Sequence, residues 1–249
     1  MNTPCKHVPT TLLLSMVALC CLSACQSAPK EANKYQPVID AWVTEDAVNP
    51  SPQGGVLFIG SSSIRLWKTL HEDFPQYDVI QRGFGGSTFA DANLFIDKIV
   101  TPYRPQAIVV FEGTNDIASG KSAEQVFKDY KRFVKLIRQG ESGQSKPADI
   151  LFIGITPTES RWAHWPEMRK LNRMVLDYTQ QHPATHYIDT PTPFLATATE
   201  PNGPPSRDLF RKDLLHLSPA GYALWTRVIT PQIEAVCPPT QAKVSRDTP

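Results

Sequence analysis

The stretch Gly55-Val-Leu-Phe-Ile-Gly60-Ser61-Ser62-Ser63-Ile64 joins a short apolar run to a glycine and three serines. The run Gly55–Ile59 is small or apolar throughout, which is typical of a buried strand. Gly60 permits a tight exit from that strand, and the serines stand where the chain would turn into a helix. A hydroxyl at such a turn lies beside backbone N–H groups that can stabilise an oxyanion. Serines there also commonly cap a helix, so this stretch alone leaves both interpretations open.

Short apolar runs alternate with amphipathic segments along the rest of the chain. We expect strands at Gly55–Ile59, Tyr77–Gln81, Ala107–Phe111, Ile150–Ile155 and His186–Ile188. Helices are expected at 35–43 and near 64–73, 89–99, 122–139, 166–181 and 219–234. Strands that alternate with helices predict a parallel sheet with helices on both faces. The proline-rich stretch Pro191–Pro205 is expected to be a long loop that shapes a pocket.

A carboxylate and an imidazole stand three residues apart in Asp213-Leu-Leu-His216-Leu-Ser218-Pro219. Ser218 is a good helix N-cap and Pro219 suits the first helical position, so the pair is predicted on a loop that enters a helix. An aspartate that accepts from one ring nitrogen fixes the histidine tautomer and supports the imidazolium form. A serine hydroxyl needs such a base beside it to act as a nucleophile. A turn-capping Asp213 and a surface His216 would give the same pattern.

Two further loops follow other expected strands. The first is Arg82-Gly-Phe-Gly-Gly86-Ser-Thr88, and the second is Glu112-Gly-Thr-Asn115-Asp116. In an open α/β sheet the carboxyl ends of parallel strands form one edge, where ligands bind. Each loop could be an ordinary turn. Their occurrence together with the serine and Asp–His segments predicts a single site at that edge.

These four segments, in this order, resemble the SGNH (GDSL-type) hydrolase superfamily, which is named for a Ser, a Gly, an Asn and a His in four blocks. The resemblance covers roughly residues 53–235. It implies a three-layer, flavodoxin-like α/β/α sandwich with a five-stranded parallel sheet. It also implies that Ser62 is the nucleophile, His216 the general base and Asp213 its orienting partner. The backbone N–H groups of Ser62 and Gly86 and the side-chain amide of Asn115 would form the oxyanion hole.

The first block departs from the family pattern at one position. It usually reads Gly-Asp-Ser, whereas this chain reads Gly60-Ser61-Ser62. The neighbouring Phe58-Ile59 and the later Trp67 hold the register, which assigns the nucleophile to Ser62 rather than to either adjacent serine. The substitution bears on the geometry of the turn more than on the chemistry.

The residue set indicates acyl transfer, here ester hydrolysis through an acyl-enzyme. The expected substrate is a short-chain or acetyl ester, such as one on an envelope or dietary polysaccharide. A lipase, lysophospholipase or thioesterase with a longer acyl site is one alternative, and a catalytically silent lipoprotein that binds a glycan or partner is another. Arg161, Trp162 and Trp165 follow the fourth strand and are expected to line the acyl or alcohol subsite. Packing against the next helix is the alternative for them.

The N-terminal segment resembles a bacterial lipoprotein signal peptide. Lys6 precedes the apolar run Thr10–Leu22, which is too short for a comfortable membrane span and fits a secretory signal. The following Leu22-Ser-Ala-Cys25 resembles a lipobox, which implies cleavage before Cys25 and acyl chains on that residue. Several acyl chains on one terminus would anchor the protein stably. An ordinary cleaved signal with a chance cysteine is the alternative.

The expected organisation is a signal peptide at 1–24, a tether at 25–34, the hydrolase domain at 35–237 and a flexible tail at 238–249. By the lipoprotein pattern, Gln26 in place of an aspartate after the cysteine indicates the outer membrane of a Gram-negative bacterium. We therefore expect a lipid-anchored protein of the cell envelope that faces the periplasm.

Composition excludes several other functions. The chain carries 25 Lys and Arg against 24 Asp and Glu, with no basic run, so we expect no nucleic-acid partner. Three of the five cysteines leave with the signal and Cys25 would be lipidated, so Cys237 has no cysteine left to pair with. No Cys/His spacing suggests zinc, and Gly83-x-Gly85 lacks the third glycine of a dinucleotide site. We expect neither a metal nor a cofactor.

Overall fold

The computed structural model describes Met1 and residues 33–239. The predicted signal peptide, Cys25 and most of the predicted tether and tail lie outside the described residues, so these assignments stay predictions. Across the described part of the chain, no helix has the length and apolar content needed to cross a membrane.

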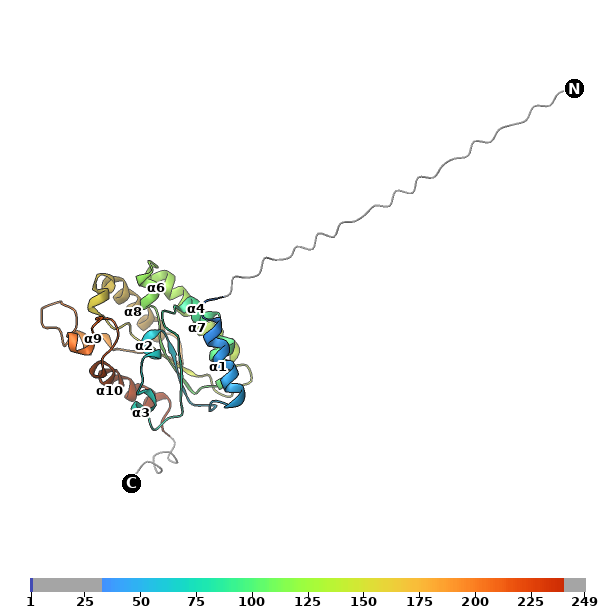
Figure 1. The fold of residues 1–249 in the computed structure, drawn as a ribbon, viewed down its shortest axis with the longest axis horizontal. Helices are drawn as coiled ribbons and strands as arrows, with labels where there is room; N and C mark the ends of the chain where they lie inside the picture. The colour runs from blue at the N-terminus through green and yellow to red at the C-terminus, as the bar shows by residue number, and fades with distance from the viewer. Residues whose placement is uncertain (2–32, 240–249) are drawn as a thin grey trace. The chain divides into compact units, whose positions relative to one another are not determined.

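Five parallel strands form one sheet in the order β2-β1-β3-β4-β5, and Figure 1 shows helices on both sides of this sheet. Every residue of the three central strands β1, β3 and β4 is buried, as expected for a parallel sheet that is covered on both faces. The predicted five-stranded parallel sheet is therefore confirmed, with boundaries that differ by one or two residues. The strands are β1 (Val56–Gly60), β2 (Val79–Gly83), β3 (Ala107–Phe111), β4 (Asp149–Ile153) and β5 (Thr185–Ile188).

Helices pack on both faces of the sheet and give the predicted three layers. Leu57 and Ile59 of β1 point into one hydrophobic core, and Val56 and Phe58 point into the other. The first core is covered by α1 (Gln36–Val48), α4 (Phe89–Asn93), α5 (Ile96–Ile99), α7 (Ala123–Gly140) and α8 (Trp165–Thr179). The second is covered by α2 (Ser62–Arg65), α3 (Leu70–Asp73), α9 (Pro191–Leu195) and α10 (Pro219–Val236).

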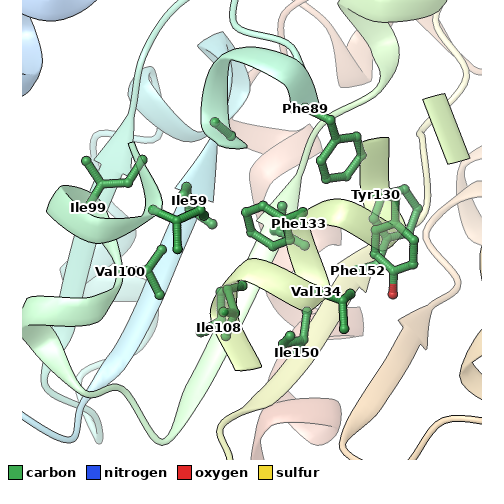
Figure 2. Packing of buried hydrophobic residues seen from close by; sticks show 14 of the residues in the cluster. Ile59, Phe89, Ile99, Val100, Ile108, Tyr130, Phe133, Val134, Ile150 and Phe152 are labelled. Atoms are coloured by element: carbon green, nitrogen blue, oxygen red, sulfur yellow. The ribbon is translucent and has the colours of Figure 1, made fainter. Parts of the chain in front are cut away.

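The first core is built from branched strand residues beneath the aromatic rings of the helices. Figure 2 shows Ile108 and Ile150 of the sheet beside Phe133 and Val134 of α7, with Phe89 of α4 nearby. All five side chains are buried. Burial of each such side chain contributes about 1.5–3 kcal/mol relative to leaving it exposed. This packing fixes the sheet that carries the candidate site.

Four predicted segments differ from the structure, the first of them the helix expected at 35–43, which continues to Val48 as α1. The helix expected at 64–73 is split into α2 and α3, because the carbonyls of Ile64 and Trp67 accept hydrogen bonds from the Gln81 side chain. The helix expected at 89–99 is likewise divided, into α4 and α5. The loop expected at Pro191–Pro205 begins as the short helix α9, for which Pro191 is a favourable first residue.

The sheet register brings the carboxyl ends of three strands together. Gly60, the last residue of β1, pairs with Gly83 at the end of β2 and with Phe111 at the end of β3. The chain leaves β1 toward β2 on one side and returns to β3 on the other, so the order reverses at β1. Ligands of open α/β sheets bind outside such a reversal point. The loops that follow these three strands carry Ser62, Gly86 and Asn115.

Candidate active site

The Ser62 hydroxyl stands on a tight turn between β1 and α2. Ser62 is the first residue of α2, and Ser61 is its N-cap. Gly60 adopts a φ of +154°, and a Cβ at that position would lie 2.3 Å from the carbonyl oxygen of Phe111, so only glycine fits. Ser61 and Ser63 are buried, whereas Ser62 is half-buried. Of the three serines, Ser62 is therefore the one that presents its side chain at the carboxyl edge of the sheet.

Three side chains from distant parts of the chain form a line of hydrogen bonds. The Ser62 Oγ lies 2.9 Å from Nε2 of His216, and Nδ1 of His216 lies 2.7 Å from Oδ2 of Asp213. The second carboxylate oxygen of Asp213 accepts from the backbone N–H groups of Leu215 and His216. Burial alone would raise the pKa of Asp213, but these bonds outweigh it and lower that pKa to about 2. Asp213 is therefore a carboxylate at any pH near neutral.

The loop that carries His216 is closed by its own backbone. Arg211 N–H donates to the carbonyl of His216 at 2.7 Å, and Leu214 N–H donates to the carbonyl of Arg211 at 2.9 Å. Leu214 takes a φ of +54°, which costs a residue with a side chain about 1–2 kcal/mol. Ser218 caps α10 by accepting from Gly221 N–H, as the sequence predicted. Asp213 and His216 thus lie on the entry loop of a helix in a fixed conformation.

The glycine loop after β2 forms a tight turn at the edge of the site. The turn runs from Phe84 to Ser87 and is closed by Ser87 N–H donating to the Phe84 carbonyl at 3.2 Å. Gly86 adopts a φ of +81°, which the third position of a type II turn requires. The Tyr35 hydroxyl donates to the Gly85 carbonyl at 3.4 Å and supports the turn from the side of α1.

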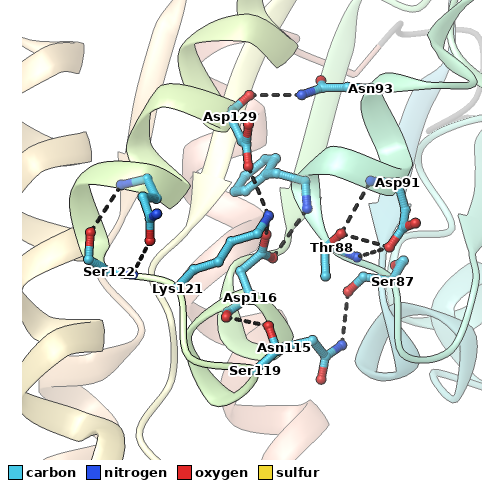
Figure 3. A network of polar contacts seen from close by, with 12 residues as sticks. Ser87, Thr88, Asp91, Asn93, Asn115, Asp116, Ser119, Lys121, Ser122 and Asp129 are labelled. Atoms are coloured by element: carbon cyan, nitrogen blue, oxygen red, sulfur yellow. Dashed lines mark hydrogen bonds and ion pairs between the residues drawn. The ribbon is translucent and has the colours of Figure 1, made fainter.

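Asn115 lies in the first turn of α6 (Thr114–Ala118) and reaches the same glycine loop. Its Nδ2 donates to the carbonyl of Ser87 at 2.9 Å, as Figure 3 shows. Its Oδ1 accepts from Nη2 of Arg161 at 3.0 Å. A side-chain amide carries two N–H donors. One is used by Ser87, which leaves the other for a ligand.

Glu112 is a buried acid that sequence reasoning did not single out. It follows β3 directly, is 1% exposed, and its Oε1 accepts from the Ser87 hydroxyl at 2.5 Å. Burial raises the pKa of Glu112 well above its usual range, and the nearby Asp116 carboxylate adds to this effect against the hydrogen bond from Ser87. In the sequence, Glu112 stands out only as an acidic residue that directly follows an apolar strand.

An open pocket lies over Ser62 and encloses about 390 Å³ of space, open solvent included. Its walls combine apolar side chains with hydroxyl groups, and the one ionised side chain among them is Arg161. The lining residues are Ser61, Ser62, Ser63, Phe111, Thr114, Asn115, Thr156, Thr158, Arg161, Leu215, Leu217 and Trp225. Within residues 33–239, no group of three or more His, Cys, Asp and Glu side chains is placed to hold a metal ion.

The two tryptophans expected beside Arg161 lie elsewhere. Trp162 and Trp165 stack on each other with ring centroids 6.3 Å apart, and the described residues that line the pocket include neither. Trp165 is 8% exposed at the start of α8, and Trp162 packs against the first core. Their positions fit the alternative of packing against the helix. Arg161, by contrast, is among the residues that line the pocket.

The arrangement suits proton transfer from a hydroxyl that attacks a carbonyl carbon. A serine bonded to one ring nitrogen can pass its proton to the ring while the carboxylate on the other nitrogen stabilises the imidazolium. Backbone N–H groups at the start of α2 and the free N–H of Asn115 border the same pocket. Such donors stabilise an oxygen that becomes negatively charged.

A family model described as "GDSL-like Lipase/Acylhydrolase family" matches residues 60–224. No curated protein matches the chain.

Several solved structures share the fold. A GDSL-like lipase from Bacteroides thetaiotaomicron is 19% identical, with a TM-score of 0.64 over 79% of this chain and 97% of that one. A lipase/acylhydrolase from Enterococcus faecalis is 19% identical, with a TM-score of 0.57 over 75% and 98%. A variant of an acetyl-xylooligosaccharide esterase from Geobacillus is 16% identical, with a TM-score of 0.56 over 74% and 95%. At these identities the likeness speaks for the fold alone.

Proposed function

The chain belongs to the GDSL-like lipase/acylhydrolase family and is an enzyme that hydrolyses ester bonds, and from that premise we propose that Ser62, His216 and Asp213 are its catalytic triad. The observation that carries the proposal is the unbroken line of hydrogen bonds from the Ser62 hydroxyl through His216 to the Asp213 carboxylate. Ser62 and His216 are 154 residues apart in the sequence, so the fold brings them together and local sequence does not.

The proposed reaction has two halves. The Ser62 Oγ attacks the ester carbonyl carbon while its proton passes to Nε2 of His216. The imidazolium then gives that proton to the leaving alkoxide, which departs as the alcohol and leaves an acyl-enzyme. Water attacks the acyl-enzyme with His216 as base, releases the acid and restores Ser62. Asp213 stays ionised throughout and stabilises the imidazolium.

The oxyanion of each tetrahedral intermediate would be held by three donors. Two are the backbone N–H groups of Ser62 and Gly86, and the third is the free N–H of Asn115. All three are neutral, so their contribution comes from fixed dipoles in a partly buried site. The Ser87–Asn115 hydrogen bond ties the glycine loop to α6 and supports a fixed spacing of the last two donors.

A short acyl chain is the substrate favoured by the pocket. The walls beside Ser62 are apolar side chains and hydroxyl groups, which suit a small acyl group. Phe111 and Trp225, whose rings lie 4.7 Å apart, are buried and fill the wall behind the serines. One structural relative is an acetyl-xylooligosaccharide esterase and another is a lipase/acylhydrolase, so relatives represent both short and longer acyl groups. We favour an acetyl or other short ester.

Hydrolysis of p-nitrophenyl acetate, butyrate and octanoate by the full chain in detergent tests this choice. We expect kcat/KM to fall as the acyl chain lengthens, because Phe111 and Trp225 leave little room for a long chain. Faster turnover of the octanoate would favour the lipase-like alternative. Absence of turnover on all three esters would point to a natural ester that these compounds do not mimic, and would contradict the choice of a simple short-chain ester.

We place the enzyme in the cell envelope, anchored through acyl chains on Cys25 at the periplasmic side, with the outer membrane favoured by Gln26. The support is the lipobox-like sequence, which lies outside the described residues. Cys25→Ser should shift the protein from the membrane fraction to the soluble fraction in an expressing Gram-negative cell. Metabolic labelling with a fatty-acid analogue should mark the wild type and not the variant. A Cys237→Ser variant is the matched control, and persistent membrane attachment of Cys25→Ser would exclude this anchor.

A further inference from the structure

The Asn115 side-chain amide is held at both of its polar atoms. Its nitrogen donates to the Ser87 carbonyl at 2.9 Å, and its oxygen accepts from Nη2 of Arg161 at 3.0 Å. Figure 3 shows the first of these contacts, between α6 and the loop after β2. Arg161 comes from a third segment, the 3-10 helix η2 (Glu159–His164) after β4. One amide therefore joins three loops of the sheet edge.

The two contacts select one orientation of the amide. A half-turn about the terminal bond would place the amide nitrogen against the Arg161 guanidinium, where two donors would face each other. It would also place the amide oxygen against the Ser87 carbonyl, where two acceptors would meet. Arginine has no acceptor and a carbonyl has no donor, so neither new contact could form a hydrogen bond. The observed orientation keeps the remaining N–H of Asn115 available to the pocket.

A second hydrogen bond fixes the position of the Arg161 guanidinium. Its Nη1 donates to the Thr114 carbonyl at 2.8 Å, so the guanidinium binds both the backbone before Asn115 and the Asn115 side chain. No ion pair found among residues 33–239 pairs Arg161 with a carboxylate. Burial lowers the pKa of Arg161. Among the described residues, the hydrogen bonds of Arg161 thus go only to neutral acceptors. A charged group that loses hydration without a compensating ion pair costs free energy, which indicates a function for Arg161 at the pocket.

We propose that Arg161 is a positioning residue for the oxyanion hole, which clamps the Asn115 amide so that one N–H faces the oxygen bonded to the attacked carbon. The proposal rests on the proposed function of Ser62 and Asn115. The guanidinium also withdraws electron density from the amide oxygen, which makes the amide N–H a stronger donor. Arg161 thereby acts on the transition state through Asn115 and not through the substrate.

A double-mutant cycle on the full chain in detergent tests this proposal. Arg161→Met keeps the length of the side chain and removes its donors, and we expect kcat to fall about 10- to 100-fold with little change in KM. In an Asn115→Ala background the same substitution should change kcat less than about twofold, because residues that act as one unit are not additive. A full additional loss in that background would show that Arg161 acts independently of Asn115 and would overturn the proposal.

Further variants separate positioning from folding and from substrate binding. Arg161→Lys keeps one charged donor and should recover part of the lost kcat. Arg173→Met, on the exposed side of α8 in an i,i+4 pair with Asp177, is the matched control and should keep wild-type kcat and Tm. A rise in KM at unchanged kcat for Arg161→Met would make Arg161 a substrate contact instead. Equal losses for Arg161→Met and Arg161→Lys, with lowered Tm in both, would make it merely structural.

Two measurements distinguish a failure of the Arg161 clamp on Asn115 from a failure of the proposed esterase function. The rate at which a fluorophosphonate labels Ser62 depends on the same oxyanion hole and needs no knowledge of the natural ester. If the wild type is not labelled at Ser62, the proposed function fails. The clamp is then judged by NMR: the Asn115 side-chain amide protons should exchange slowly in the wild type and faster in Arg161→Met. Identical exchange in the two proteins would refute the clamp.

Discussion

Replacement of Ser62 by alanine is expected to lower kcat by about 10⁴-fold or more while the protein stays folded. The Ser62 Oγ is the atom that would form the covalent bond to the acyl group, and its hydroxyl lies within hydrogen-bond distance of Nε2 of His216, 2.9 Å away. Alanine keeps the backbone N–H that begins α2, so binding and part of the oxyanion hole should survive. The measurement is kcat on p-nitrophenyl acetate together with Tm.

The neighbouring serines make the Ser62→Ala result decisive. Ser61 and Ser63 are buried on either side of it, whereas Ser62 is half-buried with its hydroxyl on His216. Ser142→Ala, at an exposed position between α7 and β4, is the matched control and should leave kcat and Tm unchanged. Wild-type turnover by the Ser62→Ala protein would move the nucleophile to Ser61 or Ser63. A large fall in Tm would instead assign Ser62 a structural role.

Replacement of Asn115 by alanine is expected to lower kcat about 10²- to 10³-fold with a much smaller change in KM. The reason is that the free N–H of Asn115 gains a strong acceptor only when the carbonyl oxygen becomes an oxyanion. Substrate binding before that point uses the amide little. Steady-state kinetics on a short p-nitrophenyl ester separates the two parameters.

A second variant at this position controls for the loss of packing. Asn115→Asp keeps the shape of the side chain and its contact with Arg161, but it replaces the N–H donor by an oxygen. We expect it to be at least as slow as Asn115→Ala, because the carboxylate would repel the oxyanion and the Ser87 carbonyl. If either variant raises KM and leaves kcat unchanged, the oxyanion role of Asn115 is contradicted.

Much of the sheet and of the site could be predicted because their signals are local. The all-apolar run at β3 and the cap formed by Ser218 before α10 each depend on a few adjacent residues, and both are observed. The positions of Ser62, Gly86 and Asn115 at one edge follow from the rule that parallel strands share their carboxyl ends. The Asp213–His216 contact follows from a separation of three residues on one loop.

The remaining features depend on contacts between segments that the sequence does not pair. The break between α2 and α3 is accompanied by hydrogen bonds from the Gln81 side chain, 17 residues beyond Ile64, to the carbonyls of Ile64 and Trp67. The direction of the side chains on η2 was not visible in the sequence, so Trp162 was expected at the subsite although it packs against the first core. Burial in the assembled fold raises the pKa of Glu112, and an isolated strand end shows no sign of that burial.

The most direct test of Ser62 as the nucleophile is to map by mass spectrometry the site at which a fluorophosphonate reacts with the full chain. We expect one adduct, on the peptide that contains Ser62, and its complete loss in the Ser62→Ala protein. Asn115→Ala should still be labelled at Ser62, but more slowly. An adduct on any other residue, or a folded and esterolytic protein that remains unlabelled, would contradict the assignment of Ser62 as the nucleophile.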